Sequence, residues 1–231
     1  MNNIHEFKNL FIEFETETKK RAKEKYATLD ECITKLKTQG YNPYVKESTF
    51  ISFCRKLRNV DFHNKNDNYY FITTETITKL KEIVEEVKHP HKVLEKATTD
   101  IYSKNINDKV LPTMKKMNKE SYTHIPIYNN NNNILEGVFS ENTLFKYIID
   151  NKKIEINEDT TFNDIKECIS LDKSDEIVIF VPKNKLYDDV VNDFIKKYKD
   201  GNKLSCVMIT NNGTSKEKVQ GIITSWDVIG S

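Results

Sequence analysis

The sequence predicts an α+β protein of two domains, an all-helical N-terminal bundle over residues 1–90 followed by an α/β domain. Two observations predict this division. Up to residue 88 the apolar residues recur at the three- and four-residue spacing of helices, whereas beyond residue 92 short β-branched runs alternate with helical stretches. His89 and Pro90 stand at the change of pattern, and a proline commonly ends a helix.

Four helices are expected in the N-terminal domain. The first covers residues 4–26, where aromatic and aliphatic residues form one apolar face. The second covers residues 30–38 and ends at Gly40, because glycine readily adopts the left-handed conformation of a helix C-cap. The third begins at Ser48 or the threonine after it, either of which can cap a first turn. The fourth covers residues 75–88 and has an apolar stripe of its own.

The second domain is expected to hold five strands and three longer helices. β-Branched and aromatic residues mark strands at residues 123–128, 134–139, 176–181, 205–210 and 219–224. Helical periodicity places helices near residues 108–118, 141–150 and 187–198.

One pattern occurs twice in this second domain. The first copy has His-Ile-Pro-Ile at residues 124–127 and then Gly137-Val-Phe-Ser140. The second copy has Cys-Val-Met-Ile at residues 206–209 and then Gly221-Ile-Ile-Thr224. In both copies a hydroxyl stands three residues after the glycine and a helix begins at once. Each copy alone would leave one face of its sheet exposed, so we expect the two copies to pack face to face.

The composition argues against several classes of protein. With 36 Lys and Arg against 35 Asp and Glu the formal net charge is +1, whereas dedicated nucleic-acid-binding and membrane-surface proteins usually carry a basic excess, so we expect no DNA and no membrane as partner. No apolar run reaches the about 18 residues that span a bilayer, and the N-terminus lacks the layout of a signal peptide. The four cysteines have no metal-ligand spacing. We therefore expect no metal, a cytoplasmic location and buried free thiols at Cys54, Cys168 and Cys206.

The most specific motif is Gly221-Ile-Ile-Thr224-Ser-Trp-Asp227, which fits the G-h-h-T/S-x-x-D signature of the CBS family. From about residue 94 onward the chain resembles a tandem pair of CBS motifs, the first over residues 92–155 and the second over residues 156–231. In this family the two copies form one disc-like module. The chemistry of the motif fits a nucleotide, since the N–H groups of a helix start favour phosphate and a carboxylate can accept from both ribose hydroxyls.

The resemblance implies a nucleotide site between the two copies. Asp227 would bind the ribose, Thr224 the ribose or a phosphate, and Ile222 would flank the base. The other copy would complete the cleft with Thr98 or Thr99 and with Tyr122, Thr123 and His124. The implied ligand is an adenine nucleotide, with AMP, ADP or ATP favoured. The alternative is that Thr224 and Asp227 only cap the last helix, as such residues often do.

A pseudo-symmetric second site would use the equivalent residues Ser140, Thr143 and Ser205. Thr143 stands where the family has an aspartate, so this second site lacks its carboxylate. We therefore expect the second site to be empty or altered.

The N-terminal domain contains one chemically suggestive string, in which Arg58 is followed by Asn59 and, five positions after the arginine, by His63. This R-x4-H spacing resembles the HEPN family of small helical bundles. The resemblance implies metal-independent cleavage of RNA. His63 would act as general acid and base, Arg58 would stabilise the phosphorane, and Asn59 would orient the phosphate or the histidine. The alternative is a structural or partner-binding bundle in which Arg58 pairs with Asp61 or caps a helix end.

Together these features predict a homodimer in which the CBS pair binds an adenine nucleotide and controls the helical domain. Both resemblances imply two chains, because CBS discs pair and HEPN sites form across a dimer. Two other functions stay open at this point. One is a nucleotide-regulated HEPN-type endoribonuclease that acts on RNA, and the other is a non-catalytic dimer scaffold.

Overall fold

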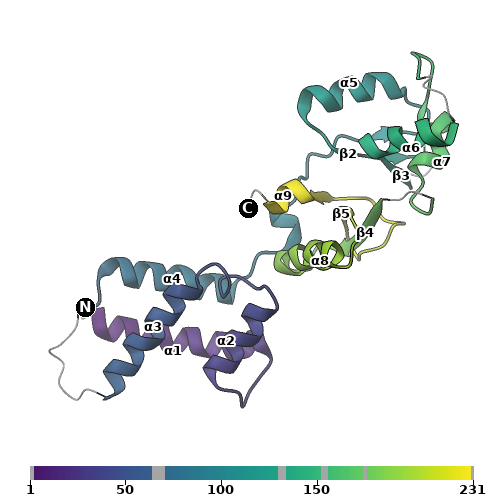
Figure 1. Cartoon of the computed structure of the whole chain (residues 1–231). Coiled ribbons are helices and arrows are strands. Elements are labelled where there is room, and N and C mark those ends of the chain that lie inside the picture. Colours follow the sequence, from purple (N-terminus) through teal and green to yellow (C-terminus); the bar gives the residue numbers. More distant parts are fainter. Residues whose placement is uncertain (1–2, 64–70, 130–133, 152–155, 174–175, 230–231) are drawn as a thin grey trace. The chain divides into compact units, whose positions relative to one another are not determined.

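The computed structural model describes residues 3–63, 71–129, 134–151, 156–173 and 176–229, without the side chains of residues 60–63 and 151. The chain forms two compact units, Met1–His91 and Lys92–Ser231, which we call unit 1 and unit 2 (Figure 1). The division falls beside the boundary at residues 90–92 that the sequence predicts. Separate hydrophobic clusters fill the two units.

Unit 1 contains four helices in its described residues, α1 (Asn3–Ala22), α2 (Leu29–Thr38), α3 (Ser48–His63) and α4 (Thr74–Lys88). The apolar stripes of the sequence build its core. On α1 the side chains of Phe7, Phe11 and Phe14 are at most 2% exposed, and α4 contributes Leu80 and Val84 at 1%. An all-helical domain with one core is therefore confirmed for these residues.

A few local residues fix the helix ends. α1 ends at Ala22, four residues before the predicted end, because Lys23 adopts a left-handed backbone conformation with φ of 56°. Gly40 has φ of 75° and closes α2, as predicted. Ser48 was expected to cap α3 but is its first helical residue, since the carbonyl of Glu47 accepts the first helical hydrogen bond.

Unit 2 is built on two three-stranded sheets of the same topology. The first contains β1 (Lys104–Asn105), β2 (His124–Tyr128) and β3 (Leu135–Ser140), and the second contains β4 (Ile177–Pro182), β5 (Leu204–Thr210) and β6 (Gly221–Thr224). In each sheet the first strand pairs parallel with the second, and the second pairs antiparallel with the third. All five predicted strands are present within two residues at each end.

The strand register shows that the sequence repeat is also a structural repeat. Ser140 pairs with His124 in the first sheet, and Thr224 pairs with Cys206 in the second. The two glycines of the motif likewise pair with Ile127 and Ile209. Residues 124–127 and 137–140 of the first β-hairpin therefore correspond to residues 206–209 and 221–224 of the second.

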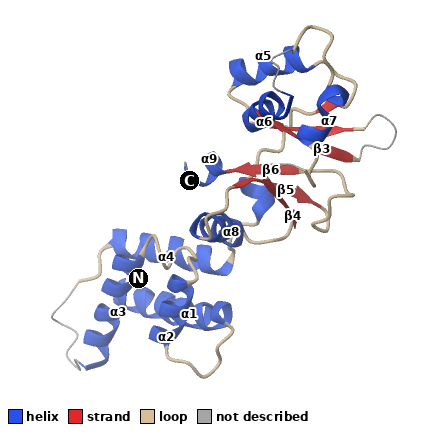
Figure 2. Cartoon of the chain, turned by 45° about the vertical axis from the view of Figure 1, so that its right-hand side comes forward, coloured by secondary structure: helices blue, strands red, loops and turns tan. Residues whose placement is uncertain are grey.

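The helices of unit 2 cover the outer faces of the two sheets. α5 (Val110–Glu120), α6 (Glu141–Asn151) and α7 (Lys166–Ile169) lie beside the first sheet and α8 (Tyr187–Lys199) beside the second, while α9 (Ser225–Ile229) follows β6 (Figure 2). The sequence did not predict β1, α7 or the two 3₁₀ turns η1 (Val93–Lys96) and η2 (Phe162–Ile165). These elements have two to four residues, which is too short for a periodic pattern.

The inner faces of the two sheets share one hydrophobic cluster. β3 contributes Leu135 and Val138, β5 contributes Cys206 and Met208, and β6 contributes Ile222, all at most 6% exposed. The predicted face-to-face packing of the two copies is thereby confirmed.

The leading segment of each half, residues 92–103 and residues 156–173, crosses to the sheet of the other half. Thr98 exchanges two backbone hydrogen bonds of 3.0 Å with Ile222 of β6. In the same way, Ser170 forms an antiparallel bridge with Gly137 of β3. The two halves are therefore interlocked through their backbones as well as packed through their side chains.

The two glycines of the repeat lie at these crossings. A Cβ atom on Gly137 would stand 2.0 Å from the carbonyl oxygen of Ile169. A Cβ atom on Gly221 would stand 3.0 Å from the side chain of Ala97. Glycine is needed at Gly137 because the backbone of Ile169 passes close by, whereas the atoms nearest to Gly221 belong to side chains.

All four cysteines of the chain are free and buried, which confirms the prediction for Cys54, Cys168 and Cys206. Burial raises the pKa of the Cys54 thiol to about 12, so this thiol is unreactive at neutral pH. Among the helices of the described residues, none is both long enough and apolar enough to cross a membrane.

Candidate ligand-binding site

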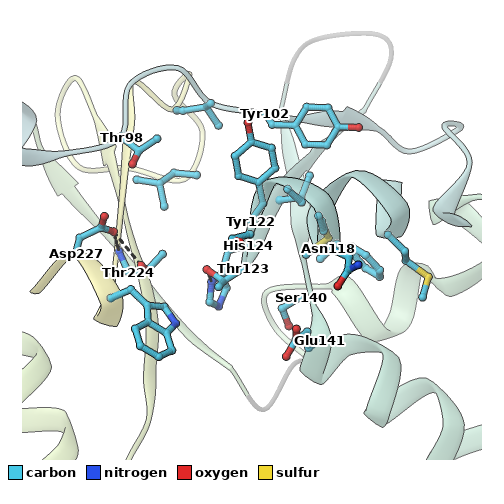
Figure 3. A pocket seen from close by; sticks show the side chains of 18 of the residues that line it. Thr98, Tyr102, Asn118, Tyr122, Thr123, His124, Ser140, Glu141, Thr224 and Asp227 are labelled. Atoms are coloured by element: carbon cyan, nitrogen blue, oxygen red, sulfur yellow. Dashed lines mark hydrogen bonds between the residues drawn. The ribbon is translucent and has the colours of Figure 1, made fainter. Parts of the chain in front are cut away.

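A cavity of about 730 Å³ lies within unit 2 where the two halves of the repeat meet, and we call it the first cavity. One wall carries Ile222, Thr224 and Asp227 of the second half, joined by the crossing Thr98. The opposite wall carries Tyr102, Tyr122, Thr123 and His124 of the first half. Figure 3 shows Thr98, Thr224 and Asp227 on one side of the open space and the Tyr102, Tyr122, Thr123 and His124 group on the other. The crossed topology therefore brings residues about a hundred positions apart to one site.

Asp227 is held in place by the start of α9. Its Oδ2 accepts hydrogen bonds from the Thr224 backbone N–H at 2.6 Å and from the Thr224 hydroxyl at 2.9 Å. This is the helix-capping arrangement that the sequence left open as the alternative to ligand binding. Both bonds use one oxygen, and no described residue donates to Oδ1. Capping thus fixes the carboxylate at the cavity wall and leaves an acceptor for a ligand.

Aromatic rings form part of the opposite wall. The rings of Tyr102 and Tyr122 are stacked, with centroids 5.5 Å apart and planes 24° from parallel. The Lys116 ammonium lies 4.1 Å from the centroid of the Tyr102 ring and holds that ring in place. This pair offers the cavity an ordered aromatic surface.

His124 lies at the base of the first cavity with its side chain only 13% exposed. Its Nδ1 is 2.9 Å from the Thr123 hydroxyl, and its Nε2 is 3.8 Å from Oε1 of Glu176. Burial lowers the pKa of His124; the carboxylate of Glu176 opposes this effect and Lys203 adds to it. His124 is therefore neutral at pH 7.

Acid is expected to destabilise unit 2 through His124. Because the pKa of His124 is lowered in the folded state, the unfolded chain takes up this proton first, and the free energy of unfolding falls as the pH drops below about 6.5. Each unit by which the pKa is lowered contributes about 1.4 kcal/mol. His124→Gln should make the decrease in stability between pH 7.5 and 5.5 smaller, measured by urea denaturation. An unchanged pH dependence in this variant would contradict the assignment.

The charged residues that line the first cavity are acidic. Asp100, Glu141 and Asp227 carry carboxylates, and no lysine or arginine is present among the described residues that line it. Sequence reasoning missed Asp100, Tyr102 and Glu141, because none of them belongs to a motif with fixed spacing. The lining therefore places three carboxylates around a ligand, while the Lys104 and Lys116 ammonium groups lie 5.3 and 4.1 Å from the centroid of the Tyr102 ring.

The structure brings together most of the residues that the sequence proposed for the nucleotide site. Seven of these eight residues line the first cavity: Thr98, Tyr122, Thr123, His124, Ile222, Thr224 and Asp227. Thr99 does not line it. Adjacent residues of an extended segment point to opposite sides, so the backbone that presents Thr98 to the cavity turns Thr99 away.

A second cavity of about 400 Å³ lies at the pseudo-symmetric position. Of the residues proposed for it, Thr143 and Ser205 line this second cavity, whereas Ser140 lines the first cavity. Ser140 and Thr143 cap α6 reciprocally, through backbone-to-hydroxyl bonds of 3.0 and 3.3 Å. The arrangement repeats that of Thr224 and Asp227 with a hydroxyl in place of the carboxylate. The second cavity is lined by two carboxylates, those of Asp150 and Glu176, neither of which the sequence singled out.

In unit 1, Arg58 and Asn59 line a groove of about 400 Å³ together with Glu15 and Asp30. Nη2 of Arg58 lies 3.8 Å from the Glu15 carboxylate, and Nη1 donates to Asn59 at 3.4 Å. The side chains of His63 and Asp61 lie outside the described part of the chain.

Comparison with known proteins identifies part of unit 2. Residues 95–150 match the CBS domain family, a match that covers about a quarter of the chain. The matched range does not include residues 1–90 or the second half of unit 2. No curated protein matches the chain.

Several solved structures are similar to this chain. The CBS domain pair of protein MJ0100, solved with 5′-methylthioadenosine and S-adenosyl-L-methionine, shares 22% identity over 61% of this chain and 94% of that chain, with a TM-score of 0.44. A putative acetoin utilization protein (AcuB) from Vibrio cholerae shares 17% identity over 61% and 89%, with a TM-score of 0.44. The CBS protein TA0289 of unknown function from Thermoplasma acidophilum shares 18% over 61% and 68%, with a TM-score of 0.43.

Proposed function

We propose that unit 2 is a tandem CBS pair that binds an adenosine-containing ligand in the first cavity and serves as a regulatory sensor. The convergence of Asp227 and Thr224 with Thr98, Tyr122 and His124 on one cavity carries this proposal. A volume of about 730 Å³ is in the range of small-molecule sites. The CBS match over residues 95–150 supports the same function.

The parts of such a ligand follow from the chemistry of the walls. Oδ1 of Asp227 would accept from the ribose hydroxyls, since Thr224 already occupies Oδ2. The stacked rings of Tyr102 and Tyr122 offer a surface for the adenine base, and base–aromatic stacking is worth about 1–3 kcal/mol. Ile222, only 6% exposed, provides an apolar contact beside it.

The charge of the residues that line the first cavity predicts an order of affinity among adenosine-containing ligands. The sequence favours AMP, ADP or ATP, but three carboxylates without a lining lysine or arginine disfavour a polyphosphate. We expect uncharged adenosine to bind more tightly than ATP. We also expect S-adenosylmethionine to bind more tightly than S-adenosylhomocysteine, which differs in lacking the methyl group and the positive charge on sulfur. Two unit charges about 7 Å apart in water interact with an energy of about 0.6 kcal/mol, which changes the affinity about threefold.

Isothermal titration calorimetry with these four ligands tests both the function and the ranking. Glu141→Gln should lower the affinity ratio of S-adenosylmethionine to S-adenosylhomocysteine by about threefold and leave adenosine binding unchanged. If no adenosine compound binds the chain, the proposed function is wrong. If ATP binds most tightly, the function stands and the charge argument is wrong.

A regulatory role requires that the ligand binds two arrangements of the protein with different affinity. We propose a homodimer in which ligand binding to unit 2 changes the arrangement of the helical units. Sedimentation velocity with and without the tightest ligand measures this. A monomer under both conditions would remove the dimer from the proposal. The endoribonuclease function of unit 1, and with it the HEPN resemblance, stays a prediction from the Arg58–His63 spacing.

A further inference from the structure

The loop between β5 and β6 contains Asn212 followed by Gly213, the one asparagine–glycine pair of the chain. Such a pair is able to modify itself, because the backbone nitrogen of the glycine can attack the side-chain carbonyl carbon of the asparagine. Glycine favours this attack since it has no side chain to obstruct the approach. Asn212 is exposed, so water can reach the products of the attack.

The reaction at this pair has two steps. In the first step the Gly213 nitrogen gives up its proton to a base and bonds to Cγ of Asn212, while the bond from Cγ to Nδ2 breaks and Nδ2 leaves as ammonia with a proton from water. In the second step water adds to one of the two carbonyl carbons of the resulting succinimide ring and breaks the bond of that carbon to the ring nitrogen. The product is an aspartate or an isoaspartate, and water is the only co-reactant.

The fold requires glycine at position 213. Gly213 has φ of 84°, in the left-handed region that side chains other than hydrogen rarely adopt. A Cβ atom at this position would lie 2.8 Å from Cδ and 2.9 Å from the backbone nitrogen of Pro182, at the end of β4. The glycine of the reactive pair therefore cannot be replaced without strain in the loop.

Two neighbouring residues hold both reacting groups of the pair. Oε1 of Glu217 accepts a hydrogen bond of 2.5 Å from Nδ2 of Asn212, and its Oε2 accepts one of 2.8 Å from the backbone N–H of the same residue. The backbone N–H of Gly213 donates to the hydroxyl of Thr210 at 2.9 Å, and Thr210 is fully buried. The attack of Gly213 on Asn212 therefore requires these hydrogen bonds to open.

The charge of Glu217 adds to this protection. The hydrogen bond from the Asn212 backbone N–H is the largest of the effects that lower the pKa of Glu217 to about 2, so this carboxylate is charged at neutral and alkaline pH. Loss of the Gly213 proton creates a second negative charge in the same loop, and the attack then places it on the side-chain oxygen of Asn212. The nearby carboxylate disfavours both of these anions.

We propose that Asn212 is a site of spontaneous modification, and that hydrogen bonds to Glu217 and Thr210 protect it while the loop is closed. When the loop opens, the side-chain amide is lost and an aspartate or isoaspartate remains. The new carboxylate would lie beside that of Glu217, where the amide donates at present, so the loop would not close again as before. Asn212 does not line the first cavity, and this proposal is independent of the ligand proposed there.

Incubation at mildly alkaline pH followed by peptide mapping tests the proposal. Cleavage by trypsin after Lys203 and Lys216 releases the peptide Leu204–Lys216, which contains Asn212 but not Glu217. The same peptide is therefore measured in every variant of Glu217. A hydrogen bond to a charged group contributes a factor of about ten to a hundred, so Glu217→Ala should form isoaspartate at position 212 about tenfold or more faster than the unchanged folded chain. The chain unfolded in urea gives the rate without protection.

Lys218→Ala is the matched control, because Lys218 is exposed beside Glu217 and no described bond joins it to Asn212 or Gly213. This control should react at the rate of the unchanged chain. Glu217→Gln keeps the shape of the side chain and one acceptor oxygen, so it should react at an intermediate rate and guards against a folding defect in Glu217→Ala. If neither Glu217 variant reacts faster than the unchanged chain, the protection is wrong. If the unfolded chain is also unmodified at position 212, the modification site is wrong.

Asn212→Asp reproduces the charge of the product and tests its consequence for the loop. A contact between two carboxylates would replace the hydrogen bond from Asn212 to Glu217, so the midpoint of thermal unfolding should fall by about 3 °C. Adding Glu217→Gln to this variant should restore part of the loss, because the second charge is removed. A midpoint equal to that of the unchanged chain would show that the loop closes again after modification.

Discussion

Replacing Gly137 by alanine is expected to unfold unit 2 under conditions where the unchanged chain is folded. The new Cβ atom would lie 2.0 Å from the carbonyl oxygen and 2.6 Å from the carbonyl carbon of Ile169. These are backbone atoms and cannot rotate away, so the crossing segment would have to leave β3 and break the bridge between Gly137 and Ser170. We expect a loss of about 3 kcal/mol or more, at the upper end of overpacking effects.

Gly221→Ala is the matched control, because Gly221 is the counterpart of Gly137 in the other sheet. Its new Cβ atom would meet only side chains, those of Ala97, Leu94 and Ile209, at 3.0 to 3.2 Å. The Leu94 and Ile209 side chains can rotate, and a contact of 3.0 Å requires the Cβ atom of Ala97 to move by only a few tenths of an ångström, so we expect a loss of about 1–2 kcal/mol. Urea denaturation followed by circular dichroism measures the loss in each variant. Equal losses in the two variants would contradict the role given to the Ile169 backbone.

Asp227→Asn is expected to lower the affinity of the first cavity for its adenosine ligand by about tenfold to a hundredfold. Hydrogen bonds to a charged acceptor contribute about 1.5–3 kcal/mol, and the amide keeps the shape of the side chain without its charge. The cap on Thr224 can persist through the amide oxygen, so the midpoint of thermal unfolding should change little. Calorimetric titration of the tightest adenosine compound measures the affinity.

Asp164→Asn provides the control for this variant. Asp164 accepts from the Thr161 backbone N–H at 2.8 Å and from the Thr161 hydroxyl at 2.7 Å, which is the bonding of Asp227 at a place that does not line the first cavity. Its replacement should leave ligand affinity unchanged. If both variants weaken binding equally, Asp227 acts only as a helix cap.

Elements with a strong local pattern could be predicted from the sequence. The repeated glycine and hydroxyl of each copy predicted the paired sheets. The residues that indicate a strand and those that begin the next helix lie within about ten residues of one another in each copy. The same motif led to Thr224 and Asp227. Tyr122 and His124, which were assigned to the site through the family resemblance, also line the first cavity.

Elements and contacts that depend on parts of the chain far apart in the sequence could not be predicted. β1 has two residues and is defined by its pairing with Ile127 and Tyr128, so no local pattern marks it. Glu176 stands in a polar stretch, and only the packing of the two sheets brings it to Ser140. The missing aspartate at Thr143 led to the expectation of an empty or altered second site, but nothing in the sequence pointed to Glu176.

The crossed leading segments have a consequence for how the protein is made. Thr98 pairs with Ile222, a residue about 120 positions further along the chain. A ribosome adds about 5–20 residues each second, so the earliest part of unit 2 waits on the order of ten seconds for its partner strand. During that time the first sheet exposes an apolar face and an unpaired edge. Pairings over such distances also slow folding after release, so the time of greatest aggregation risk for this protein falls during and just after its synthesis.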